Sequence, residues 1–193
     1  MTRWDRLAPL YRPLMWPLEV LWLRRWRRRA ASAIPGAARL LEVGAGPAMN
    51  VPFYPPRVRG VASDVSMVML AGGSRREGMA RVVADVQKLP FRDRAFDVAL
   101  ATFLFCGVPD DRQGLREVRR VVVPGGVCVF LEHVRPEGRV GGFLADLLER
   151  FTAPIFGEHV NRRTVENVAR EDFAIERVET AAGTLLRLIV ARR

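Results

Sequence analysis

A glycine turn that follows a short apolar run, with an acidic residue at a set distance after it, constrains this chain more than any other feature. Residues 40–50 read Leu-Leu-Glu-Val-Gly-Ala-Gly-Pro-Ala-Met-Asn, and Asp64 comes twenty residues after Gly44. The apolar side chains suit a strand covered on both faces, while Gly44 and Gly46 let the backbone turn tightly beside a ligand. A carboxylate at this distance can accept hydrogen bonds from ribose hydroxyls. The pattern therefore indicates an open parallel sheet that binds an adenosine-containing cofactor.

The same turn argues against a dinucleotide cofactor. A G-x-G-x-x-G fingerprint would place its last glycine at position 49, which is Met49. Glu42 instead gives the arrangement Glu-x-Gly-x-Gly, which resembles motif I of the class I S-adenosylmethionine-dependent methyltransferases (type 11 group). Ala48 departs from the family, which usually has a third glycine there. Its methyl group either displaces a helix slightly or weakens cofactor binding.

Four later segments resemble the family in the same order. They match the second strand with its ribose-binding acid, the third strand with an acid near the adenine, the fourth strand, and a helix with its Pro-Gly-Gly turn, at 60–70, 82–91, 96–102 and 115–126. The resemblance covers about residues 38–133 and implies S-adenosyl-L-methionine as the cofactor. The cofactor-binding residues that it implies are Glu42, Gly44, Ala45, Gly46, Asn50, Asp64, Val65, Asp85, Val86, Thr102 and Phe103.

The alternation of elements predicts an α/β fold with a doubly wound, mostly parallel, Rossmann-like sheet and helices on both faces. Helices are expected at 17–33, 66–75, 110–122, 140–152 and 161–171. Strands are expected at 39–44, 58–63, 81–85, 96–102, 127–133, 173–180 and 184–192, with a closing hairpin turn at 180–184. The resemblance implies seven strands with the last one antiparallel. The proline-rich run 50–56 leaves no room for a long first crossover helix.

Bulk properties fit one domain over residues 1–193, and the resemblance implies that it is a methyltransferase domain. No apolar run approaches the roughly twenty residues that cross a bilayer, and no signal peptide is visible, so a cytoplasmic protein is expected. Cys106 and Cys128 lack the spacing of metal ligands and are expected to be buried, reduced thiols. No metal site is predicted.

Positive charge is concentrated at the N-terminus. The chain has a formal net charge of +10, and residues 1–30 hold eight arginines against Asp5 and Glu19, together with all four tryptophans. A helix starting at Pro17 would place Leu18, Leu21, Trp22 and Trp26 on one face, ahead of an arginine-rich end. Such a helix is attracted to an anionic membrane surface, which would put the protein at the inner face of the membrane. Alternatively, residues 1–33 form a lid over the cofactor with solvated arginines, and both roles can hold together.

Nucleic acid is not an expected partner, because no RNA-binding module or zinc knuckle is present. Arg116, Arg119 and Arg120 form a second basic cluster that we interpret as a solvated helix face.

The candidate catalytic residues are His133 and Tyr11. His133 follows the fifth strand and can serve as a base, although a histidine tied to a backbone carbonyl is the simpler interpretation. His159 is a weaker candidate. Tyr11 resembles a tyrosine in the N-terminal segment that covers the cofactor in quinone and phospholipid methyltransferases, although Arg12 stands where the family has aspartate.

Three groups of methyltransferases are similar to this chain, and all of them handle lipophilic acceptors. The early Asp-Arg-Leu-Ala-Pro-x-Tyr segment looks like bacterial phospholipid N-methyltransferases. The run 50–56, the Cys106 loop and Glu132-His133-Val134 look like membrane-associated thiol methyltransferases, and the N-terminus is also similar to quinone C-methyltransferases. The leading hypothesis is a phospholipid amine of the phosphatidylethanolamine type as acceptor, with a quinone or a small thiol as alternatives. A non-catalytic membrane-binding or scaffold protein that kept the fold is the alternative from a different class.

Overall fold

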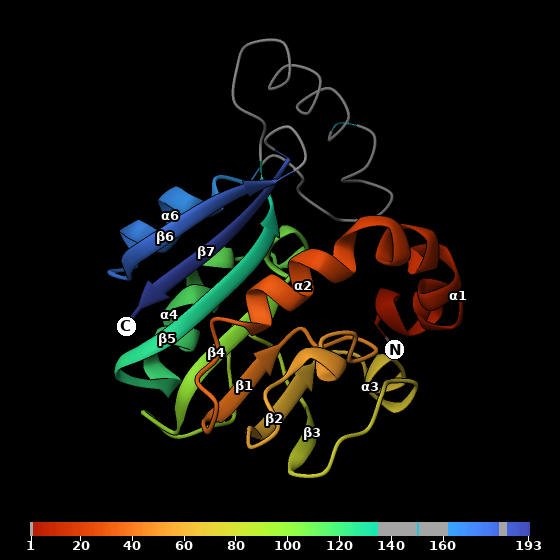
Figure 1. Cartoon of the computed structure of the whole chain (residues 1–193), viewed down its shortest axis with the longest axis horizontal. Coiled ribbons are helices and arrows are strands. Elements are labelled where there is room, and N and C mark those ends of the chain that lie inside the picture. The colour runs from red at the N-terminus through yellow and green to blue at the C-terminus, as the bar shows by residue number, and fades with distance from the viewer. Residues whose placement is uncertain (1, 135–149, 151–161, 182–184) are drawn as a thin grey trace.

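A computed structural model of the chain describes residues 2–134, 150, 162–181 and 185–193, and shows one sheet with helices on both faces (Figure 1). The strands are β1 (Arg39–Val43), β2 (Arg59–Asp64), β3 (Met79–Val83), β4 (Phe96–Thr102), β5 (Val122–His133), β6 (Ala174–Ala181) and β7 (Leu186–Arg192). They form a seven-stranded sheet in the order β3-β2-β1-β4-β5-β7-β6. The pairs among β1 to β5 are parallel, whereas β7 runs antiparallel to both β5 and β6. The predicted fold class is confirmed.

Two strand boundaries differ from the prediction in ways that affect the site. β3 begins and ends two residues earlier than expected, so Asp85 lies in the turn after the strand, where it bridges Lys88. β5 begins at Val122 because this residue already pairs with Phe96 before a register shift, which shortens the preceding helix by one residue.

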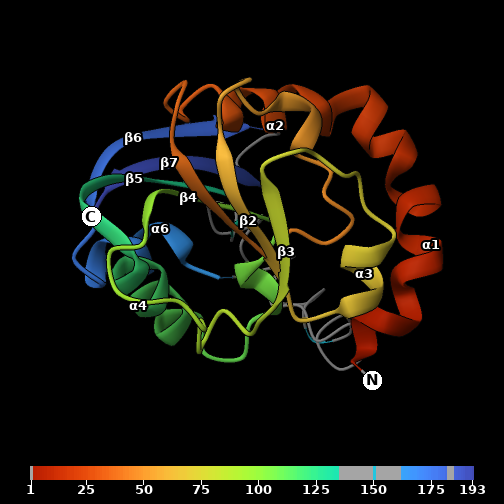
Figure 2. The same ribbon diagram turned by 90° about the horizontal axis from the view of Figure 1, so that it is seen from below.

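The helices are α1 (Arg3–Leu18), the π-helix η1 (Glu19–Leu23), α2 (Arg24–Ala31), the 3₁₀ turn η2 (Val51–Phe53), α3 (Met67–Ala71), the 3₁₀ turn η3 (Phe105–Gly107), α4 (Asp111–Val121) and α6 (Thr164–Arg170). As predicted, only η2 follows β1 where a crossover helix usually lies. In its place α2 covers that sheet face, with Leu23, Ala30 and Ala31 packed in one cluster with Leu40 and Leu188. Figure 2 shows α2 on one side of the sheet and α4 and α6 on the other.

The N-terminal helix begins much earlier than the predicted residue 17. Thr2 and Asp5 form a capping box, in which the Thr2 hydroxyl accepts from the Asp5 N–H and the Asp5 carboxylate accepts from the Thr2 N–H. Pro9, Pro13 and Pro17 lie inside α1 and are all exposed. Their four-residue spacing keeps the missing donors on the outer side, where water can reach the freed carbonyls.

The predicted apolar face of this helix is wrong in part. Trp22 and Trp26 pack against the core as expected. Leu18 and Leu21 are exposed instead. The basic end also differs from the prediction, since Arg27 is buried.

The π-helical turn η1 explains which side of the N-terminal helix faces the sheet. Met15, Glu19, Leu23 and Arg27 recur every fourth residue and are buried or partly buried. An α-helix has 3.6 residues per turn, so a repeat of four drifts around its surface. The i→i+5 bonds of η1 unwind the helix locally and keep this repeat facing the domain.

Within the described residues, no helix is long and apolar enough to cross a membrane. The predicted helix 140–152, apart from residue 150, most of the hairpin turn 180–184, and His159 lie outside those residues.

The prediction that Arg116, Arg119 and Arg120 form a solvated face of α4 holds only in part, since Arg116 is exposed but Arg119 and Arg120 are half-buried. Arg120 bonds Glu117, Asp93 and the carbonyls of Leu89 and Phe91, and so fixes the loop before β4.

Candidate functional site

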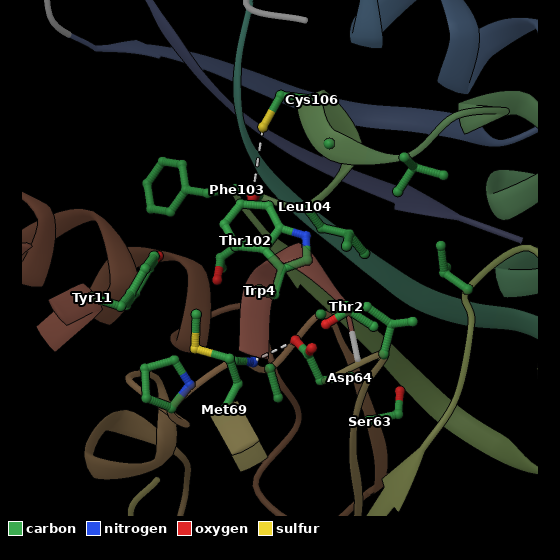
Figure 3. Close-up of a pocket in the computed structure, with 18 of the residues that line it drawn as sticks. Thr2, Trp4, Tyr11, Ser63, Asp64, Met69, Thr102, Phe103, Leu104 and Cys106 are labelled. Atoms are coloured by element: carbon green, nitrogen blue, oxygen red, sulfur yellow. Dashed lines mark hydrogen bonds between the residues drawn. The ribbon is translucent and has the colours of Figure 1, made fainter. Parts of the chain in front are cut away.

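A pocket of about 730 Å³ lies between the carboxyl ends of the central strands and the inner side of α1 (Figure 3). Such edges are where open α/β sheets bind ligands. The residues lining it are Thr2, Trp4, Tyr11, Met15, Arg27, Gly44, Ala45, Gly46, Pro47, Met49, Ser63, Asp64, Val65, Met69, Ala84, Asp85, Val86, Gln87, Thr102, Phe103, Leu104, Cys106, Gly107, Val108, Pro109 and His133. All the predicted site residues are therefore at the pocket wall except Glu42 and Asn50.

The glycine turn is braced by Asp64. Gly44 and Gly46 have φ angles of 65° and 52°, a region that favours glycine. One Asp64 oxygen accepts from the Gly46 N–H at 2.8 Å, and the other accepts from the Ser66 N–H at 2.8 Å. A carboxylate oxygen has two acceptor positions, so both oxygens keep capacity for ribose hydroxyls.

The turn also leaves room for a ligand. A methyl group built on Gly46 would meet nothing within 4 Å. Ala48 has a φ of 56° and is 2% exposed, and its side chain belongs to the apolar core and does not line the pocket. These residues fit an adenosine-type cofactor, and the methyl group of Ala48 does not intrude on it.

The second predicted acid lies further along the same wall. Asp85 accepts from the Gln87 backbone N–H at 2.9 Å, and Val86 beside it is buried. This gives the wall a fixed carboxylate next to an apolar surface, a combination suited to a purine ring and its amino group.

Glu42 and Asn50 lie behind the pocket in a buried polar network. The Asn50 amide donates to Glu42 Oε1 at 2.6 Å and to Thr102 Oγ1 at 2.9 Å, and the Tyr54 hydroxyl donates to Glu42 Oε2. Both Glu42 and Asn50 are 1% exposed or less. In this structure they hold the ends of β1 and β4 together and position the glycine turn.

Arg27 is the site residue that the sequence did not reveal. Its Nη1 donates to Asn50 Oδ1 at 3.0 Å and to Thr102 Oγ1 at 2.9 Å, while Nε and Nη2 both bond Glu19 Oε1 at 2.8 Å. Arg27 thereby ties the N-terminal helix to the strand ends while lining the pocket. One signal was available, since Glu19 is one of only two acids among the first thirty residues.

Aromatic side chains line the other end of the pocket. Figure 3 shows Asp64 and Met69 at one end and Cys106 at the other, with Trp4 and Tyr11 contributed by α1. Phe103, with a φ of 57°, lies 4.9 Å from the His133 ring and 5.0 Å from the Arg27 guanidinium carbon, measured from its ring centroid. A left-handed conformation is uncommon for a bulky residue and marks this position as one that the site imposes.

Burial shapes the ionisation of several groups at this edge, and it raises the pKa of Asp64. Burial lowers the pKa of His133, so its ring is neutral at neutral pH and able to accept a proton. Burial also raises the pKa of Glu42 to about 7 and that of Glu132 to about 8. Glu132 does not line the pocket, but accepts from the backbone N–H groups of Leu104 and Phe105 at 3.1 and 3.2 Å and so fixes this wall.

These two carboxyls predict a pH-dependent stability. In the unfolded chain both carboxyls lose their protons near pH 4.5, whereas in the folded protein Glu42 keeps its proton up to about pH 7 and Glu132 up to about pH 8. The free energy of unfolding therefore falls as the pH rises from about 4.5 to these values. We expect each group to lower the free energy of unfolding by roughly 1 kcal/mol per pH unit. Urea denaturation across this range measures it. Glu132→Gln should remove the decline above pH 7, and an unchanged slope in that variant would contradict the assignment.

Both cysteines are buried, as predicted, and neither is in a disulfide bond. Burial raises the pKa of Cys128 to about 12, whereas Cys106 faces the pocket.

The strand order, the braced glycine turn and the pocket at the strand ends define a class I methyltransferase fold with a cofactor-sized site. A family model described as a methyltransferase domain matches residues 41–130. A solved S-adenosylmethionine-dependent methyltransferase from Mesorhizobium loti has the same fold, with a TM-score of 0.67 over 86% of this chain and 96% of that chain at 22% identity.

Curated relatives are similar to this chain over longer stretches. The demethylmenaquinone methyltransferase of Paenarthrobacter aurescens (strain TC1) is 34% identical over 139 residues, covering 70% of this chain and 55% of that protein. The demethylmenaquinone methyltransferase of Mycobacterium sp. (strain KMS) is 37% identical over 120 residues, covering 60% and 51%. The chain thus spans about half the length of the curated relatives it matches. It belongs to the class I S-adenosylmethionine-dependent methyltransferase family.

Proposed function

We propose that this protein transfers a methyl group from S-adenosylmethionine to a lipophilic, ring-containing acceptor of the quinone type. The observation that carries the proposal is one continuous pocket with a carboxylate-braced glycine turn at one end and an aromatic wall at the other. When bound, the cofactor supplies an electrophilic sulfonium methyl group.

The acceptor class rests on the lining of the second end. Phe103 and His133, whose rings lie against each other there, present flat faces suited to a ring, and α1 adds Trp4 and Tyr11 to the wall of the same pocket. A phospholipid amine, the leading hypothesis from the sequence, is less well supported, because the described residues that line this end carry no carboxylate to bind a cationic headgroup. The names of the curated relatives also favour a quinone.

In this proposal His133 is the base. It lines the pocket as a neutral imidazole held against Phe103. Accepting the proton of a hydroxyl group on the reduced, quinol form of the acceptor would raise the electron density on its ring and make a ring carbon nucleophilic. That carbon would gain the methyl group as the methyl–sulfur bond breaks, and its own hydrogen would leave as a proton to restore the ring. Tyr11 closes the pocket from α1 and helps to orient the acceptor by contact with its ring.

A quinone with an isoprenoid tail resides in a bilayer, so the proposal includes peripheral contact of the N-terminal segment with an anionic membrane. No nucleic acid takes part in it.

The proposal is tested by methyl-transfer assays with radiolabelled cofactor and three acceptors: a reduced demethylated naphthoquinone, phosphatidylethanolamine and a small thiol. We expect transfer to the naphthoquinol. His133→Asn should lower kcat by about a hundredfold or more and leave cofactor affinity unchanged, because general-base catalysis contributes at least that much. Preferred transfer to phosphatidylethanolamine would contradict the quinone assignment. Failure to bind cofactor in calorimetry would favour the non-catalytic alternative.

A further inference from the structure

The outer side of α1 carries large apolar side chains in water. Leu10, Leu14, Leu18 and Leu21 are 65%, 75%, 52% and 82% exposed, and Trp16 is 65% exposed. The leucines recur at intervals of three and four residues, which places them along one side of the helix. A contiguous apolar strip of this kind marks an interaction surface more often than chance exposure of single residues. We call these four leucines the leucine strip; Trp16, two positions from both Leu14 and Leu18, lies on another side of the helix.

The helix that carries the leucine strip is anchored on its other side. The Ser66 hydroxyl at the start of α3 donates to Asp5 Oδ1 at 2.5 Å, and Glu19 pairs with Arg27 inside the domain. Figure 2 shows α1 along one edge of the molecule beside α3, so its outer side faces away from the sheet. The strip is therefore presented by a fixed helix whose polar contacts are already made inside the domain.

Positive charge adjoins the strip. Arg24, Arg25 and Arg28 are exposed on α2, one turn or two beyond Leu21. Arg25 and Arg28 also line a hollow of about 520 Å³ together with Trp26, Arg29, Ser32 and Glu179. An apolar strip that continues into arginines matches the two layers of an anionic bilayer surface, where acyl chains lie just below phosphate groups.

The prolines limit how deep the helix can lie. Pro9, Pro13 and Pro17 leave the carbonyls of Asp5, Pro9 and Pro13 without their i→i−4 donors. Such carbonyls need water or headgroup donors and are costly in hydrocarbon. The headgroup layer supplies both, whereas a dry protein interface would leave the carbonyls unpaired. A helix that lies parallel to the bilayer in its headgroup layer agrees with the leucine strip, the adjoining arginines and the prolines.

We propose that the leucine strip with Arg24, Arg25 and Arg28 docks this protein on the surface of an anionic phospholipid bilayer. The bilayer would be the binding partner of the protein in the function proposed above, and the reason for docking rests on that function. Trp4, Tyr11 and Met15 on the inner side of the same helix line the pocket. Docking through α1 therefore brings the acceptor end of the pocket next to the membrane that holds a lipophilic acceptor.

Vesicle sedimentation of the full chain tests the proposal, with phosphatidylcholine vesicles with and without phosphatidylglycerol. Binding is expected to need the anionic lipid and to weaken with salt. Changing Leu10, Leu14 and Leu21 to Gln should weaken it by about tenfold or more, because three apolar contacts are lost. Arg24→Gln with Arg25→Gln should have an effect of similar size. The matched controls are Leu185→Gln, whose leucine is 50% exposed on the sheet side, and Arg57→Gln with Arg92→Gln, and neither should change binding.

Calorimetry with S-adenosylmethionine on the same variants separates docking from the proposed function. Unchanged cofactor affinity with lost vesicle binding supports the docking surface, and so does an inactive protein that still binds vesicles through these residues. Equal vesicle binding by the leucine variant and the native chain would overturn the proposal. It would also be overturned if light scattering showed a dimer that the leucine changes convert to monomers while vesicle binding persists.

Discussion

Replacing Arg27 by methionine is expected to lower the free energy of unfolding by about 3–5 kcal/mol, because the change leaves the Glu19 carboxylate buried without its partner. The side chains of Arg27 and Glu19 are 4% and 5% exposed. Asn50 and Thr102 would each lose a hydrogen-bond donor as well. For a domain of this size the melting temperature should fall by roughly 10 °C, measurable by calorimetry or circular dichroism.

A paired variant separates the structural role of Arg27 from a role in binding. Glu19→Leu combined with Arg27→Met replaces the ion pair by apolar groups and should recover most of the lost stability. Arg27 also lines the pocket, so we expect Arg27→Met to weaken cofactor binding, and we expect this loss to persist in the double variant. Recovery of both the stability and the cofactor affinity in the double variant would show that Arg27 only holds the helix in place. Equal instability of the single and double variants would contradict the buried-charge explanation.

Replacing Asp64 by alanine is expected to weaken S-adenosylmethionine binding by about 2 kcal/mol or more, or roughly thirtyfold, as loss of charge-assisted hydrogen bonds would. The change removes the acceptor for ribose hydroxyls and also the brace on the Gly46 N–H. Isothermal titration calorimetry measures the affinity directly.

Asp97 provides the control for that experiment. It pairs with Arg39 at the opposite, amino-terminal end of the strands, where the same loss of a carboxylate leaves the pocket intact. Asp97→Ala should therefore bind cofactor like the native chain. Native affinity in Asp64→Ala would rule out Asp64 as the ribose ligand.

The cofactor end of the pocket was largely predictable from the sequence because its geometry is local. Gly44, Gly46 and Asp64 must adopt their roles wherever a strand, a turn and a second strand follow at this spacing. The number of strands and the antiparallel β7 followed from the resemblance across the whole segment, whereas the strand order came from the structure. Errors at the starts of β3 and β5 came from pairings with distant strands, which no local pattern contains.

The N-terminal helix shows where local rules fail. The first helix was expected to start at Pro17, yet α1 starts at Arg3 and continues through Pro9, Pro13 and Pro17 because all three lie on its exposed side. The 3.6-residue period placed Leu18 and Leu21 on the same face as Trp22 and Trp26, but the π-helical turn η1, which contains Leu21 and directly follows Leu18, changes which side chains face the domain. The continuation of α1 through the prolines and the exposure of the two leucines both depend on which side of the helix packs against the sheet.

The sequence by itself determined the fold, the family, and the glycine turn with its acid, since all of these depend on short-range spacing and on the alternation of buried strands and helices. Only the tertiary structure decided that Glu42 and Asn50 stand behind the pocket, that Arg27 enters it, and that the leucines of α1 face outward. The reason is that charge burial and exposure depend on contacts between residues far apart in the chain. Arg27 meets Thr102 across 75 positions, and Glu19 in the same helix was the one local sign that this arginine differs from those beside it.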